Sequence, residues 1–151
     1  MFANRVLALL AAAWFGAYLL AGYGAAPLLF QSLPKEQAGS LAGALFSAVN
    51  YIGLFVWAIL YLAGLSAQQR SYGQRSKLSS RTIALTWLLL AVSQFVLVPL
   101  IRALRGGQTH WLSNLLGGEL SFWHSMSSSL YVLISLLGLF LIMRLLRFEW
   151  Q

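Results

Sequence analysis

Four long apolar runs constrain this chain more than any other feature of its sequence. They cover residues 6–30, 38–65, 82–104 and 120–143, and apart from Arg102 they contain no Asp, Glu, Lys or Arg. A transmembrane helix needs about 20 apolar residues, and backbone polar groups inside a bilayer are satisfied only in helices or closed barrels. The runs therefore predict an all-α integral membrane protein, in which the whole chain, residues 1–151, forms a single four-helix bundle.

The composition agrees with a membrane protein and argues against a nucleic-acid partner. Hydrophobic residues make up 60% of the chain and charged residues only 9%, whereas about a quarter of an average soluble domain is charged. The formal net charge is +7, but the basic residues flank the apolar runs and do not line a soluble face. We therefore expect the lipid bilayer to be the main partner.

The residue types present exclude several kinds of chemistry. The chain has no Cys and no Asp, and its three acidic residues, Glu36, Glu119 and Glu149, lie outside the apolar runs. A carboxylate pair for acid–base catalysis or cation transport is therefore missing from the bundle. Neither G-x-S-x-G nor H-E-x-x-H occurs. The sequence predicts a protein that is not an enzyme and that has too few acidic residues and histidines for a dinuclear metal site. It leaves any cofactor unidentified.

The segments between the runs predict how the helices connect. The first run begins after Arg5 like a signal peptide, but it exceeds an h-region of roughly 7–15 residues, so we expect a retained helix. The short connector 31–37 makes the first two helices antiparallel neighbours. Residues 66–81 read as a solvated basic loop, and residues 111–116 as a short amphipathic piece at the membrane interface.

Basic residues predict the orientation of an up-down bundle in the bilayer. Arg5, Arg70, Arg75, Lys77, Arg81, Arg144 and Arg147 lie on one side, and Lys35, Arg102 and Arg105 on the other. Because Lys and Arg are enriched in cytoplasmic segments, we expect both termini and the central loop to be cytoplasmic.

The fourth run carries a polar face at helical spacing. His124, Ser128, Tyr131 and Ser135 follow one another at i, i+4, i+7 and i+11. Polar groups are costly against lipid, so we expect this face to turn inward and meet polar groups of other helices. Together with Tyr23, Asn50 and Gln94, the residues His124, Ser128 and Tyr131 form a candidate binding cluster in the middle and outer half of the bundle.

Each of these polar residues has a structural alternative. His124 either holds helices in register through hydrogen bonds, or binds haem or copper with Met126, or takes part in proton handling or small-molecule binding. On an ideal helix Met126 points away from His124, which weakens the pair. Asn50 and Gln94 are typical of interhelical hydrogen bonds as well as of ligand contacts.

Two arginines break the charge pattern on the outer side. Arg102 and Arg105 either bind an anion or lipid phosphate, or extend to the headgroups, or pair with Glu119. Candidate helix-packing positions are a further set: Gly16, Pro27, Gly39, Gly43 and Pro99. Gly39 and Gly43 have the small-xxx-small spacing that lets helices approach closely, either within the chain or between two copies.

Several motifs resemble one known family. Gly22-Tyr-Gly-Ala-Ala-Pro27-Leu-Leu-Phe30, Ala38-Gly39-x-x-x-Gly43-x-Leu-Phe46, Tyr51-Ile-Gly53, Pro99 and His124-x-x-Ser127 resemble the transmembrane protein 205-like family. The resemblance covers nearly the whole chain. It implies a four-pass bundle of the bacterial inner membrane and no established activity. Ser125 departs from the glycine expected after the histidine.

Three functions follow as expectations. The first is a non-enzymatic binding, transport-accessory or assembly protein of the inner membrane, with a membrane-protein partner or a second copy of the chain as possible partners. The second is a haem- or copper-binding redox or metal-handling protein. The third is an oligomeric small-solute transporter or channel, because four helices alone leave little room for a pore.

Overall fold

The computed structural model describes residues 2–70 and 77–147, with side chains for residues 6–63 and 80–144. Within these ranges the chain is helical apart from short connections, and it contains no strand. The elements in order are α1 Phe2–Leu19, η1 Leu20–Ala25, α2 Ala26–Ser32, α3 Lys35–Arg70, α4 Lys77–Val92, η2 Ser93–Leu97, α5 Val98–Arg105, α6 Trp111–Leu116 and α7 Leu120–Arg147, where η denotes a π-helical segment. The prediction of an all-helical chain is confirmed.

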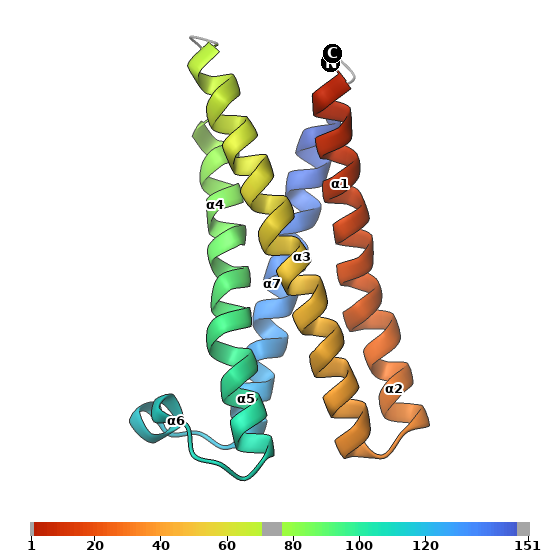
Figure 1. The fold of residues 1–151 in the computed structure, drawn as a ribbon, viewed down its shortest axis with the longest axis vertical. Coiled ribbons are helices and arrows are strands. Elements are labelled where there is room, and N and C mark those ends of the chain that lie inside the picture. The colour runs from red at the N-terminus through yellow and green to blue at the C-terminus, as the bar shows by residue number, and fades with distance from the viewer. Residues whose placement is uncertain (1, 71–76, 148–151) are drawn as a thin grey trace.

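Four helical stretches are long and apolar enough to cross a membrane. They are Val6–Ser32, Lys35–Ala63, Ser80–Arg105 and Leu120–Arg144. Successive stretches run in opposite directions, so α1 begins and α7 ends at the same end of the bundle (Figure 1). The short α6 lies at the opposite end, to the left of α5 in this view and off the bundle.

The core lies between α1, α3, α4 and α7 and is built around aromatic side chains. Trp14 of α1 packs edge-on against Trp57 of α3, with ring centroids 5.4 Å apart. The indole Nε1 of Trp14 donates a 2.8 Å hydrogen bond to the carbonyl oxygen of Val49. This bond satisfies the buried indole N–H and joins the first two spans.

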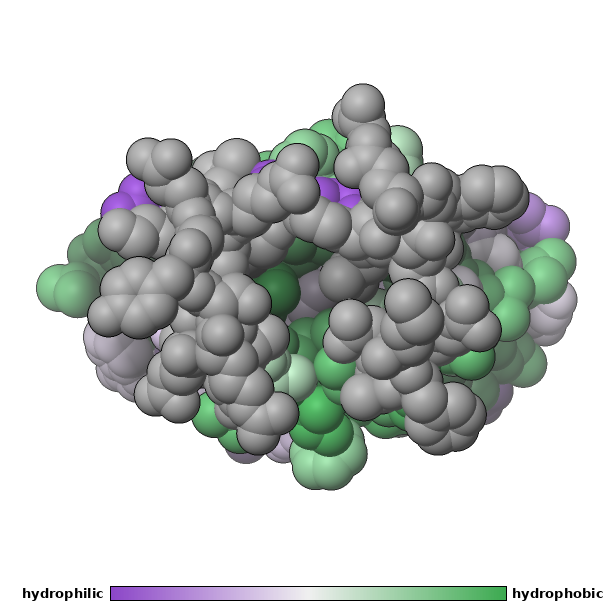
Figure 2. Space-filling model, turned by 90° about the horizontal axis from the view of Figure 1, so that it is seen from above, coloured by the Kyte–Doolittle hydropathy of each residue, from purple (hydrophilic) through white to green (hydrophobic). Residues whose placement is uncertain are grey.

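Large apolar side chains also cover the outside of the bundle. Leu9, Leu20, Phe55, Leu62 and Leu136 are each at least 60% exposed. Seen from the end where α1 begins, hydrophobic residues flank the bundle on several sides (Figure 2). A water-soluble protein of this size rarely exposes so much contiguous apolar surface, whereas lipid tails accommodate it.

The segment between the second and third spans differs from its prediction. Residues 66–81 are not a loop throughout, because α3 continues to Arg70 and α4 begins at Lys77. Ala, Gln and Arg after Ser66 are good helix formers, and charged side chains do not interrupt a helix that leaves the membrane. Residues 71–76 lie outside the described part of the chain.

Both prolines within the spans follow a π-helical segment. Pro27 is the second residue of α2 and follows η1, and Pro99 is the second residue of α5 and follows η2. A proline inside a helix lacks an N–H and clashes with the carbonyl four residues earlier. The wider π turn accommodates the proline, and the first span continues through Pro27 to Ser32.

Candidate functional site

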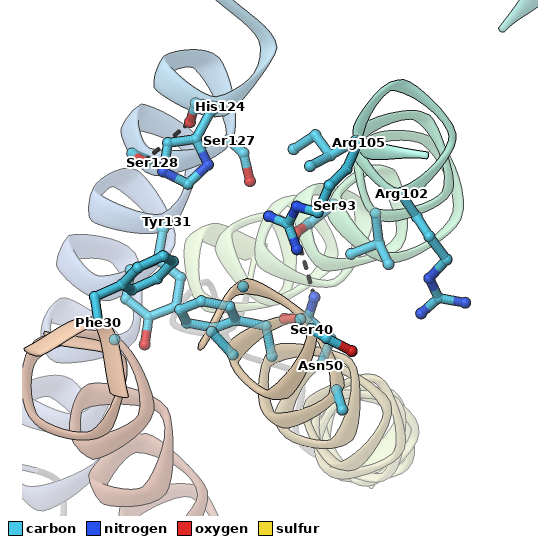
Figure 3. Close-up of a pocket in the computed structure, with 18 of the residues that line it drawn as sticks. Phe30, Ser40, Asn50, Ser93, Arg102, Arg105, His124, Ser127, Ser128 and Tyr131 are labelled. Carbon is cyan, nitrogen blue, oxygen red and sulfur yellow. Dashed lines mark hydrogen bonds between the residues drawn. The ribbon is translucent and has the colours of Figure 1, made fainter. Parts of the chain in front are cut away.

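A cavity of about 460 Å³ lies between the four spans in the half of the bundle that contains α2 and α5. Residues from η1 and α2, from α3, from η2 and α5, and from α7 line it (Figure 3). Among the residues singled out from the sequence, Tyr23, Gly39, Gly43, Asn50, Arg102, Arg105, His124, Ser128 and Tyr131 line this cavity. The structure therefore brings most of the expected polar cluster and both arginines to the same place.

Asn50 of α3 anchors one wall of the cavity. Its side chain is buried, and its Nδ2 donates to Ser93 Oγ at 3.3 Å and to Gln94 Oε1 at 3.4 Å. Ser93 and Gln94 belong to η2, whose extra residue in the turn brings two adjacent side chains toward α3. Gln94 is buried behind the wall and does not line the cavity.

The polar face of α7 is satisfied largely within its own helix. Ser128 Oγ donates to the His124 carbonyl at 3.0 Å, and Ser135 Oγ donates to the Tyr131 carbonyl at 2.9 Å. Serine hydroxyls reach the carbonyl four residues earlier in this way, so they need no partner on another helix. The expectation that these serines meet polar groups of other helices was wrong. His124 and Ser128 are exposed at the rim of the cavity.

Tyr131 is the member of the α7 polar face that reaches across to the first span. Its hydroxyl donates to the carbonyl oxygen of Tyr18, and the two phenol rings stack with centroids 4.1 Å apart. Gly22 of η1 leaves space for the Tyr131 ring, because a Cβ there would overlap it. Tyr23 is half exposed and meets Tyr131 edge to face at 5.8 Å.

The two arginines at the end of α5 differ in direction. The Arg105 guanidinium reaches into the cavity and lies on Gly39 of α3, where an added Cβ would come within 2.8 Å of its central carbon (Figure 3). Arg102 borders the cavity, but its guanidinium points away from His124. In the described part of the chain, neither arginine forms an ion pair with Glu119.

The glycines predicted to pack helices behave differently from one another. Gly39 is buried against the side chain of Arg105 and not against another backbone. Gly43 lines the cavity, and Gly16 is exposed on α1; no atom would lie within 4 Å of a Cβ at either position. Close contacts form instead at Gly53, where the Trp14 ring lies, and at Gly138, where Phe15 lies.

The cavity has the features of a binding site and lacks a cluster of metal ligands. Over residues 2–70 and 77–147, no three His, Cys, Asp or Glu residues come together. Met126 is half exposed and does not line the cavity that His124 borders. A metal in this cavity would therefore have His124 as its one imidazole ligand.

Sequence reasoning assigned no binding role to several residues that line the cavity. These are Phe30, Ser40, Phe46, Ser93 and Ser127, of which Phe30, Phe46 and Ser127 entered it only within the family motifs. Ser93 precedes Gln94 and lies six residues before Pro99. A proline soon after a polar pair is the one local sign in the sequence that could have suggested the π turn. Ser40 and Ser127 carry no signal of their own, because serines are common in transmembrane helices.

Four apolar helices with a cavity of mixed apolar and polar lining between them indicate a multi-pass membrane protein. A family model described as "Domain of unknown function (DUF4149)" matches residues 9–110, more than half of the chain, so the protein belongs to this family. The resemblance to the transmembrane protein 205-like family is corrected accordingly, because the matching family is this domain of unknown function. No curated protein and no solved structure matches the chain.

Proposed function

We propose that this protein is a membrane-embedded binding protein that holds a small amphiphilic molecule in the cavity between its four spans. The observation that carries the proposal is the mixed lining of the cavity. Phe30, Phe46 and Val132 provide apolar surface, and Asn50, Arg105 and His124 provide polar groups. Ligand sites are typically concave and mostly apolar, with a few placed polar groups, and about 300–1,000 Å³ in volume.

Binding fits this lining better than catalysis. No carboxylate is found among the described residues that line the cavity, and His124 is the one imidazole there. General acid–base catalysis needs positioned groups that exchange protons, and a nucleophile needs an adjacent base. Transport-accessory and assembly roles are compatible with the same site, since in each role the protein would first bind a molecule in the cavity.

Two glycine substitutions test the proposal. Gly43→Phe places a ring in the cavity, and Gly16→Phe places the same ring on the exposed face of α1; neither Cβ meets a neighbour within 4 Å. Glycine within a helix costs about 0.5–1 kcal/mol relative to alanine, so replacing either glycine should not weaken its own helix. We expect Gly43→Phe to lower the occupancy of retained amphiphiles roughly tenfold, because overpacking a filled site costs about 1–3 kcal/mol.

Native mass spectrometry of gently purified protein measures this occupancy. In wild type and Gly16→Phe we expect the same bound amphiphile at the same occupancy. Equal occupancy in wild type and Gly43→Phe, with both variants folded, would show that the cavity does not hold the ligand.

We further propose that the four spans lie in the bacterial inner membrane, with both termini on the cytoplasmic side. The distribution of basic residues supports this orientation. It places the cavity in the outer half of the membrane, near the end of α5. An amphiphile could therefore enter from the outer leaflet.

A further inference from the structure

We infer that the ligand of this cavity carries an anionic head group, which Arg105 binds, and an apolar chain that lies against the aromatic side of the cavity. This inference rests on the proposed binding function and specifies its ligand class. It follows from the position of Arg105, from the hydrogen-bonding groups around it and from the apolar surface opposite.

Arg105 places a positive charge in the cavity without a counter-charge in the described protein. It is the last residue of α5, where a cation complements the helix dipole. Its guanidinium lies on the backbone of Gly39, and no ion pair or hydrogen bond of this side chain is present in the part of the chain that the structure describes. Arg105 ends the third span and its side chain is exposed, so its charge is open to an anionic ligand.

The polar groups near Arg105 can each donate a hydrogen bond to an anion. The guanidinium has five N–H groups, and Ser127 and His124 lie on the facing side of the cavity (Figure 3). No carboxylate is present among the described residues of the lining to repel an anion. Guanidinium groups bind phosphate and carboxylate through paired, charge-assisted hydrogen bonds, which are about twice as strong as neutral ones.

The opposite side of the cavity is apolar and fits a hydrocarbon chain. Phe30, Phe46 and Val132 line it, and the Phe46 and Tyr131 rings meet edge to face at 5.3 Å. Phe30 and Val132 are also 44% and 46% exposed. A chain lying against them can continue into the surrounding lipid, while its head group stays beside Arg105.

Arg102 provides a matched control for Arg105. Both side chains belong to the last turn of α5, so both experience the same helix end. Only the Arg105 guanidinium reaches into the cavity toward His124 and Ser127 (Figure 3). A ligand held in the cavity should therefore distinguish the two positions, whereas a nonspecific attraction to anionic lipid should not.

The test uses the full chain in phosphatidylcholine nanodiscs. The probes are dodecyl phosphate and, as a neutral amphiphile of the same chain length, dodecanol. Apparent Kd values come from the dependence of the melting temperature on probe concentration. We expect wild type to bind dodecyl phosphate at least about tenfold more tightly than dodecanol, Arg105→Gln to lose this preference, and Arg102→Gln to keep it.

A second arm separates two sources of the same head-group chemistry. Nanodiscs containing phosphatidylglycerol, without added probe, present the anion on a bilayer lipid. Stabilisation there that depends on Arg105, with no effect of dodecyl phosphate, identifies a bilayer lipid as the ligand, and the reverse identifies a free amphiphile. Both outcomes support the inference. Equal effects of Arg105→Gln and Arg102→Gln in both arms would overturn it.

Gly39→Ala tests the same geometry without removing the charge. Its Cβ meets only the flexible end of Arg105 within 3.2 Å, so the arginine should move aside while the fold is retained. We expect the preference for dodecyl phosphate to fall as it does in Arg105→Gln. If Gly39→Ala keeps the full preference, the arginine is not held on this glycine to bind the anion.

Failure of the inference and failure of the binding function give different results. If wild type binds both probes equally and Gly43→Phe abolishes both, the cavity binds amphiphiles but Arg105 does not select an anion. If Gly43→Phe changes neither probe, the cavity is not the binding site, and the inference fails with the proposed function.

Discussion

Asn50 shows how a single polar residue is accommodated at the depth of an apolar helix. Its amide nitrogen donates to two acceptors on η2, which is part of the third span. These hydrogen bonds connect the second span to the third. Interhelical hydrogen bonds in membranes contribute modestly, about 0.6 kcal/mol on average and up to about 1.7. Their loss costs more when a buried partner is left unpaired, and Gln94 is such a partner.

We expect Asn50→Leu to destabilise the protein by about 1–2 kcal/mol, because Gln94 then remains buried without its partner. The double variant Asn50→Leu/Gln94→Leu should recover part of this loss, since both polar groups are removed. Unfolding in mixed detergent micelles measures both free energies. Wild-type stability of the single variant would contradict the structural role of this hydrogen bond.

Among the helices, contact between the first two spans depends on a glycine opposite an indole. Trp14 of α1 lies against Gly53 of α3, one helical turn after Val49, whose carbonyl accepts the indole N–H. Trp14 is 2% exposed, so its ring has little freedom to move aside. Steric fit at Gly53 therefore sets how closely α1 and α3 approach.

Gly53→Ala should lower the free energy of unfolding by about 1–3 kcal/mol, because its Cβ would come within 2.5 Å of the Trp14 indole nitrogen. Gly43→Ala on the same helix is the matched control, since its Cβ faces open space. It should be neutral or stabilising by up to about 1 kcal/mol. Thermal unfolding in one detergent compares the two, and equal effects would argue against a tight contact at Gly53.

At the scale of the whole molecule, α1 begins and α7 ends at one end of the bundle, and the cavity lies toward the other (Figure 1). Most basic residues of the chain flank the first of these ends. An even number of spans requires both termini to be on the same side of the membrane. The charge asymmetry supports the proposed cytoplasmic side.

Reporter fusions check this orientation in cells. A green fluorescent protein fused to the C-terminus should fluoresce, and alkaline phosphatase at the same position should be inactive. Phosphatase inserted at Gly107, in the connection between α5 and α6, should be active. An active phosphatase at the C-terminus would reverse the proposed orientation and place the cavity toward the cytoplasm.

The family assignment from sequence motifs was wrong, and the reason lies in the residues that carried it. Gly22, Pro27, Gly53 and Pro99 are small or helix-modifying residues. In this structure Gly22 leaves space for a phenol ring and Gly53 for an indole ring, and each proline follows a π turn. Close helix packing favours such residues in many membrane proteins, so they identify the kind of fold better than the family.

The sequence by itself determined that the chain forms four helices long and apolar enough to cross a membrane, because long apolar helices satisfy their backbone groups inside a bilayer. It also located Asn50, Gln94 and His124 as polar residues that an apolar environment must accommodate. Tertiary structure decided which residues share a cavity, and it placed Gly16 on the outside and Arg105 on Gly39. Lipid tails and the bundle interior are similarly apolar, so hydropathy leaves the rotation of each helix open, and only side-chain packing between helices fixes it.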